Sequence, residues 1–410
     1  MNIECRRFGF RSSLVEVDAP IYVLFNPWNT EDETFYPAQY ELNEYILDPI
    51  GILFKMRSKD RWLYGQFENV CLFATVELIQ RLVKENVLNT NSLASAADIA
   101  RALTFGINQY VLEASWQKLA VNDLGPYDVL PSLWTGSTEI LMHYLKAGKR
   151  VGFGQCWCYG GLLASRKLCF FIFLQERNDF IFIWNFHVWN EVWMRREGLK
   201  KSYNGWQVCD ATHQQISSES GRYQCGPFPV RALLHGDLRL PYDGPFIYGE
   251  VNADVIDRFY RTDPLSHRPI FVSEVKSTES VGIKIVTNNP KMIEFAMDIT
   301  SNYKEPEGSK AEREQHQRAL ESIGLRPMKY RRAAKELLET KIDVKFFIGE
   351  FRDVEIGKPI NGFIEVTNQS DSHRTVVSQV EVGLVCYTGM EVANVYTAHE
   401  MLKMERSQGA

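Results

Sequence analysis

The sequence lacks the features that mark several classes of protein. Its longest apolar run, residues 169–174, is too short to span a bilayer, and the first ten residues hold no apolar segment like that of a secretory signal. Lys and Arg (46) do not outnumber Asp and Glu (51). We therefore expect no transmembrane segment, a cytoplasmic location and no nucleic-acid partner.

The eight cysteines form neither a disulfide ladder nor a metal motif. They are scattered along 410 residues, and Cys156 and Cys158 are spaced more closely than the usual CxxC pair. We expect most of them to be buried, reduced thiols.

The chain changes character along its length. Residues 1–20 resemble one alternating strand and its turn. Residues 21–330 combine helical stretches, such as 70–85 and 139–149, with short strand-like runs. From residue 342 to 410, alternating segments separated by turn residues are typical of a β-sandwich. The sequence predicts an α+β protein with a domain boundary near residues 330–342.

Three segments carry a recognisable chemistry: 154–157 (GQCW), 184–191 (WNFHVWNE) and 205–212 (GWQVCDAT). Their order is Cys156, His187, Asp210. A thiol attacks as the thiolate, which a neighbouring histidine or a helix N-terminus stabilises. His187 would hold and return the proton, and Asp210 would fix the imidazole tautomer.

Local patterns indicate how these residues meet. The residues after Cys156 predict a short helix that begins at the cysteine. His187 lies on an alternating apolar strand, and Asp210 follows another. Adjacent strands would place both side chains on one face.

Simpler interpretations exist for each residue. A lone Cys is usually a small core residue, and a His in an aromatic strand is often a core residue with satisfied hydrogen bonds. Papain-like cysteine proteases use the same Cys-to-His order.

The sequence segments around Cys156, His187 and Asp210 decide between these interpretations. The sequence resembles animal-type, calcium-dependent transglutaminases over residues 20–400, through eight segments in the family's order: 25–28 (FNPW), 64–68 (YGQFE), 134–137 (WTGS), 154–157, 184–191, 205–212, 225–232 (CGPFPVRA) and 250–255 (EVNADV).

The resemblance implies both a fold and an activity. The fold is a papain-like core, here residues 21–330, followed by an immunoglobulin-like β-sandwich or barrel, here residues 342–410 and possibly incomplete. Residues 1–20 would be the remnant of an N-terminal β-sandwich. The implied activity is that of a protein-glutamine γ-glutamyltransferase, an acyltransferase that joins protein glutamine to lysine or a small primary amine through a cysteine thioester.

Further residues match family positions. Trp116 corresponds to an oxyanion-binding tryptophan and Trp184 to a wall of the amine tunnel, although both also fit plain core packing. Tyr387 corresponds to a tyrosine of the barrel that caps the resting cysteine, or it is an ordinary residue at a strand end.

The family's calcium dependence implies a metal site. Asn252, Asp254, Glu307 and Glu312 match the family's main site, and hard oxygen ligands suit Ca²⁺. On the residues alone, Glu307 and Glu312 would lie on a solvated helix face.

Two departures from the family keep a second hypothesis open. The segment between Cys156 and His187 is much shorter than usual, and a vicinal cysteine pair of some members is here Gln224 and Cys225. A catalytically impaired scaffold or binding protein that keeps the fold is therefore the alternative.

Overall fold

The computed structural model describes residues 2–7, 10–16, 25–55, 58–114, 124–165, 170–176, 186–212, 216–262, 269–292, 295–325, 344–349, 363–385 and 391–406. The helices of this part are α1 Asn69–Lys84, α2 Ala96–Gly106, α3 Ser137–Ala147, α4 Cys156–Ala164, α5 Val230–His235, α6 Gly244–Val251, α7 Thr300–Tyr303 and α8 Lys310–Ser322. No helix in these ranges is both long and apolar enough to cross a membrane.

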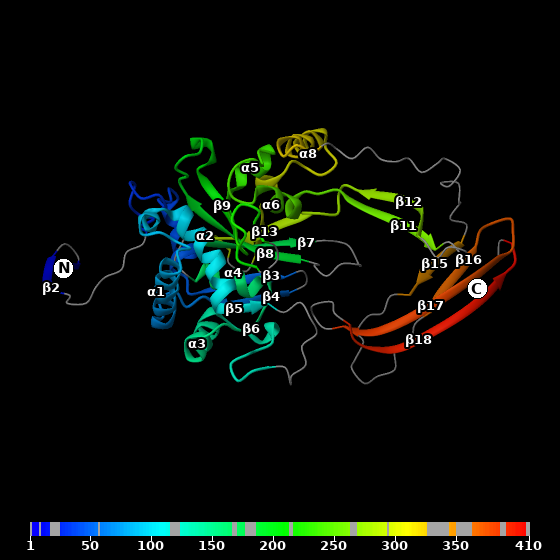
Figure 1. The fold of residues 1–410 in the computed structure, drawn as a ribbon, viewed down its shortest axis with the longest axis horizontal. Helices are drawn as coiled ribbons and strands as arrows, with labels where there is room; N and C mark the ends of the chain where they lie inside the picture. Colours follow the sequence, from blue (N-terminus) through cyan, green and yellow to red (C-terminus); the bar gives the residue numbers. More distant parts are fainter. Residues whose placement is uncertain are drawn as a thin grey trace.

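A six-stranded antiparallel sheet forms the centre of the molecule (Figure 1). Its strand order is β10-β9-β8-β7-β13-β14. The strands are β7 Phe170–Glu176, β8 Phe186–Met194, β9 Gly205–Asp210, β10 Cys225–Pro229, β13 Lys284–Asn288 and β14 Ala296–Asp298. The consecutive strands β7, β8, β9 and β10 are neighbours, so the segments with His187 and Asp210 lie side by side.

At β8 the sheet is covered on both faces. Val188 and Val192 of β8 belong to a core that is shared with α1, α2, α3 and α4. Trp189 of the same strand packs in a second core with residues of α5, α6, α7 and α8. Alternate side chains of a strand point to opposite faces. His187 and Trp189 therefore lie on the face that is covered by α6.

Helix α4 is apolar on all sides, which is typical of a buried helix. Its glycines allow close approach: a Cβ on Gly161 would lie 2.3 Å from Nε1 of Trp62. The predicted short helix is confirmed, because it begins at Cys156 and ends at Ala164.

The remaining strands form two-stranded sheets: β1 Asn2–Arg7 with β2 Phe10–Glu16, β3 Ile50–Lys55 with β4 Ser58–Leu63, β5 Leu112–Ala114 with β6 Val151–Gly154, β11 Val255–Thr262 with β12 Pro269–Ser277, β15 Val344–Ile348 with β16 Ile364–Asn368, and β17 Arg374–Val385 with β18 Glu391–Met404. All are antiparallel except β5–β6.

The structure contradicts the prediction for residues 1–20 and agrees with the strand pattern that was predicted after residue 342. The single strand predicted for residues 1–20 is wrong, since Arg7 and Phe10 are cross-strand partners in a hairpin of two strands. Strands β15–β18 agree with the alternating pattern after residue 342. The sandwich itself, the domain boundaries and the N-terminal remnant stay predictions.

Candidate active site

Cys156 is the first residue of α4, and its side chain is buried. Two hydrogen bonds hold the helix in place. The amide of Asn190 on β8 donates to the carbonyl of Gly160 at 3.0 Å, and the hydroxyl of Tyr159 donates to the carbonyl of Leu112 at 3.0 Å. The backbone N–H groups at the start of a helix are free to stabilise an anion. The thiol therefore has a fixed position at the start of a buried helix.

His187 and Asp210 meet through a short hydrogen bond. Nε2 of His187 lies 2.7 Å from Oδ2 of Asp210, and both side chains are buried. The other carboxylate oxygen, Oδ1, accepts a hydrogen bond from the backbone N–H of Thr212 at 2.8 Å. Asp210 is thus held at both oxygens, and it fixes the orientation of the ring. The sequence prediction that adjacent strands bring the two residues together is confirmed.

Electrostatics favour a charged ring. Burial by itself lowers the pKa of His187, but the charges of Asp210 and Glu250 and hydrogen bonds with Asp210 and the Cys156 thiol outweigh it and raise the pKa well above the usual value. Cys156 is among the groups that raise this pKa, so its thiol is close enough to the ring to interact with it. An imidazolium next to a thiol stabilises the thiolate, so the pair is arranged for nucleophilic attack.

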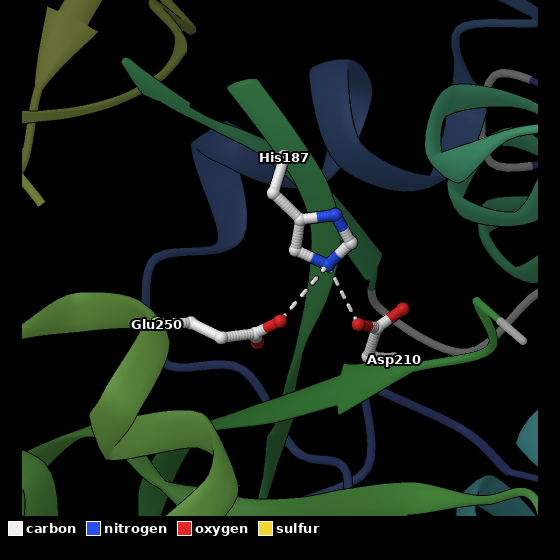
Figure 2. Close-up of side chains that lie close together, drawn as sticks. All are labelled: His187, Asp210 and Glu250. Carbon is white, nitrogen blue, oxygen red and sulfur yellow. Dashed lines mark hydrogen bonds and ion pairs between the residues drawn. The ribbon is translucent and has the colours of Figure 1, made fainter. Parts of the chain in front are cut away.

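Glu250 is a residue of this site that sequence reasoning missed. It lies on the last turn of α6, and its Oε1 is 3.7 Å from Nε2 of His187. Figure 2 shows the two carboxylates approaching the same ring nitrogen from different elements. Glu250 is the first residue of the 250–255 segment that matches the family, but this match gives no indication that Glu250 contacts His187.

A buried chain of side chains continues along the same face of β8. The ring centroids of His187 and Trp189 are 5.9 Å apart, and Nε1 of Trp189 donates to the hydroxyl of Tyr303 at 3.1 Å. That hydroxyl donates in turn to Glu191. Burial raises the pKa of Glu191 to about 8, against a smaller lowering effect from Tyr303. Glu191 is therefore largely protonated at neutral pH.

The predicted calcium ligands lie between α6 and α8. Asn252 caps the C-terminus of α6, and its amide donates to Oε1 of the buried Glu312 at 2.9 Å. Arg313 binds Glu312 and also Asp254, at 2.7 Å. Asp254 in addition forms an ion pair with Lys276 at 2.5 Å. Asn252 and Glu312 are thus linked directly, and the Arg313 guanidinium joins Asp254 to them.

Glu307 joins this cluster through a buried cation. The ammonium of Lys304 binds Glu307 and donates to the carbonyl of Val281 at 2.8 Å. Burial lowers the pKa of Lys304, although Glu307 and Glu312 act against it. In the described ranges, the carboxylates of Asp254, Glu307 and Glu312 do not come within 4.8 Å of one another as a group. The structure thus brings the predicted calcium ligands into one region, but their carboxylates are paired with side-chain cations.

Three predicted residues lie outside the described ranges: Trp116, Trp184 and Tyr387. Their roles in the oxyanion site, the amine tunnel and the cap stay predictions.

Comparisons with known proteins show which proteins this chain is similar to. The chain is 30% identical over 409 residues to the hemocyte protein-glutamine gamma-glutamyltransferase of Tachypleus tridentatus, covering 90% of this chain and 51% of that protein. It is 31% identical over 411 residues to the human coagulation factor XIII A chain, covering 91% and 53%. The chain thus spans about half the length of these relatives.

A solved structure extends the likeness to the fold. The crystal structure of red sea bream transglutaminase matches with a TM-score of 0.71 at 25% identity, covering 97% of this chain and 62% of that one. No family model matches the sequence.

Proposed function

Because the chain belongs to the animal-type transglutaminase family, we propose that it is a protein-glutamine γ-glutamyltransferase. The observation that carries the proposal is the 2.7 Å bond between His187 and Asp210. The position of Cys156 at the start of α4 supports it. Its substrates would be proteins that bear glutamine and lysine, and small primary amines.

The side chains suit an acyl transfer in two steps. The Cys156 thiolate would attack the carboxamide carbon of a glutamine, and the His187 imidazolium would give its proton to the departing ammonia. A thioester remains. A primary amine would then attack the thioester, lose a proton to His187 and release the thiolate, which leaves an isopeptide bond.

We further propose that Ca²⁺ binds at the cluster between α6 and α8. Oδ1 of Asn252 and Oε2 of Glu307 are buried oxygens without a hydrogen-bond partner, and such atoms cost free energy unless a donor or cation reaches them. Ca²⁺ takes six to eight oxygen ligands. Asn252, Asp254, Glu307 and Glu312 would supply several of them, with Ca²⁺ displacing the side-chain cations that now bind the three carboxylates.

Incorporation of a labelled amine tests the activity. The chain is incubated with Ca²⁺, a glutamine-bearing protein and a fluorescent primary amine, and labelled product is followed on a denaturing gel. Cys156→Ala should abolish incorporation. The matched control is Cys158→Ala, because it removes another buried thiol of α4 whose sulfur contacts the carbonyl of Pro131 instead; it should retain incorporation.

The outcomes separate the three functions. Incorporation that survives Cys156→Ala would rule out Cys156 as the nucleophile. A folded chain without incorporation would favour the scaffold hypothesis, and cleavage products without crosslinks would favour a cysteine protease.

A further inference from the structure

Two carboxylates share one nitrogen of the catalytic histidine. Oδ2 of Asp210 lies 2.7 Å and Oε1 of Glu250 lies 3.7 Å from Nε2 of His187 (Figure 2). The side chains of His187, Asp210 and Glu250 are 7%, 3% and 18% exposed. Glu250 is thus an ion-pair partner of the ring inside the molecule, where charges interact more strongly than at the surface.

The same three groups invite comparison with a metal site, since their ligand atoms lie within 4.8 Å of one another. In a tetrahedral zinc site the ligands are about 2.0–2.2 Å from the metal, which puts them about 3.3 Å apart. The 2.7 Å between Nε2 and Oδ2 is instead the distance of a charge-assisted hydrogen bond. The geometry therefore favours a proton on Nε2.

The packing of α6 fixes the position of Glu250. Its neighbours Tyr248 and Val251 are buried in the second core, and the N–H of Asn252 closes the helix by donating to the carbonyl of Tyr248 at 2.8 Å. A side chain on a packed helix has fewer accessible positions than one on a loop. The 3.7 Å approach to His187 is therefore a property of the fold of α6.

We propose that Glu250 is a positioning residue for His187, which acts with Asp210 to hold the charged ring against Cys156. The inference deepens the proposed function and rests on it for the role of Cys156. Asp210 supplies the hydrogen bond that sets the tautomer. Glu250 supplies a second negative charge on another side of Nε2, which restrains rotation of the ring away from the thiol.

The groups that face the ring come from several elements. Cys156 lies on α4, Asp210 on β9 and Glu250 on α6. Burial, followed by the charges of Asp210 and Glu250, raises the pKa of Cys225 on β10, so this neighbouring thiol stays neutral. The carboxyl group of Glu191, on the strand of His187, accepts a hydrogen bond from Tyr303. Glu250 is therefore the second anion at the ring.

The test is the titration of His187 itself, followed by NMR on the full chain labelled with ¹⁵N-histidine, without Ca²⁺. His187→Gln assigns the signal. In Glu250→Gln the pH at which the ring titrates should fall by about 1 unit, since an opposite charge at this distance shifts a pKa by that order. Alkylation of Cys156 by iodoacetamide at pH 7, followed by mass spectrometry, should slow several-fold.

The control is Glu191→Gln, which replaces another carboxyl group of the same core that binds Tyr303 rather than the ring. In Glu191→Gln, the pH at which His187 titrates should be the same as in the wild type. A residue that only supported folding would lower stability without moving this titration. A folded Glu250→Gln variant with the wild-type titration would therefore overturn the proposal.

Two further measurements keep the test decisive. If Glu250→Gln does not fold, Asp210→Asn leaves Glu250 as the carboxylate at Nε2, and a His187 titration at or below about 6.5 there would overturn the proposal. A wild-type titration that changes on addition of EDTA would indicate a bound metal instead and would also overturn it. Neither readout needs transferase activity, so failure of amine incorporation alone would leave this inference standing.

Discussion

Two buried clusters in this molecule use the same kinds of groups in opposite ways. At the candidate active site, two carboxylates lie beside one imidazole and raise its pKa. Between α6 and α8, the carboxylates of Glu307, Glu312 and Asp254 are bound by Lys304, Arg313 and Lys276. In the first cluster, the two carboxylates stabilise the protonated ring of His187. The second already contains its own cations, and a metal ion would have to compete with them.

The two clusters share one helix. Glu250 and Asn252 stand two residues apart at the end of α6, one in contact with His187 and the other with Glu312. The comparison therefore makes separate predictions for each cluster and for the strand β8 that supports the first.

The largest effect is expected at Asp210. Asp210→Asn removes the charge and the acceptor that orient His187, while the shape of the side chain is kept. By analogy with triads in which the aspartate is replaced, the rate of amine incorporation should fall by about 10³-fold or more. The measurement is the initial rate of labelled-amine incorporation at pH 7, with circular dichroism as a check of folding. A fall of less than about tenfold would mean that Asp210 does not set the tautomer.

The next effect concerns Glu191 and stability. Because its pKa is raised to about 8 in the folded chain from 4.5, its contribution to stability is full below pH 4.5, falls as the pH rises and is lost above about 8. Glu191→Gln has no such titration. The wild type should lose on the order of 3 kcal/mol more than the variant between pH 5 and 8.

Urea unfolding at both pH values measures this difference. The control is Glu314→Gln, an exposed residue of α8 that should follow the wild type. Parallel pH dependences for wild type and Glu191→Gln would show that Glu191 is ionised in the fold.

A smaller effect is expected at the cation cluster. Asn252→Ala removes the buried Oδ1 that has no hydrogen-bond partner. Loss of one of several oxygen ligands should weaken Ca²⁺ binding about tenfold. Titration with Tb³⁺ follows the binding, since Tyr248 lies 3.2 Å from the Asn252 amide and can sensitise its luminescence.

The control for this variant is Asn302→Ala, which alters an exposed amide of α7. Equal Tb³⁺ affinity in wild type and Asn252→Ala would remove Asn252 from the metal site, and the contrast between the two clusters would then lose its main support.

The sequence predicted the first cluster better than the second. Cys156 at a helix start and His187 and Asp210 on adjacent strands follow from local periodicity and from matching segments, and the structure confirms both. Glu250 was not predicted, because its approach to His187 depends on how α6 packs against the sheet, a tertiary fact without a local pattern.

The second cluster shows a different limit. The sequence identified Asn252 and Glu312, which are in contact. It could not show that Lys304 and Arg313 neutralise the carboxylates, since no spacing rule predicts which cation a buried carboxylate will bind. The hairpin at residues 2–16 was also missed, because a continuous alternating pattern fits one strand or two.

The smallest effect is expected at the support of α4. The Asn190 amide joins β8, which carries His187, to the carbonyl of Gly160 in α4, which carries Cys156. Asn190→Ala should cost about 1–2 kcal/mol of stability and slow alkylation of Cys156 a few-fold, because the thiol is no longer held at a fixed distance from the ring.

The matched control is Ser165→Ala. The hydroxyl of Ser165 donates to the carbonyl of Gly161 at 2.8 Å, and both residues belong to the same segment of the chain. Both variants lose one buried hydrogen bond to α4, yet only Asn190→Ala loses a bond between β8 and α4. If both slowed alkylation equally, local helix stability rather than the link to β8 would position the thiol, and the active site would be less preorganised than the hydrogen bond between His187 and Asp210 implies.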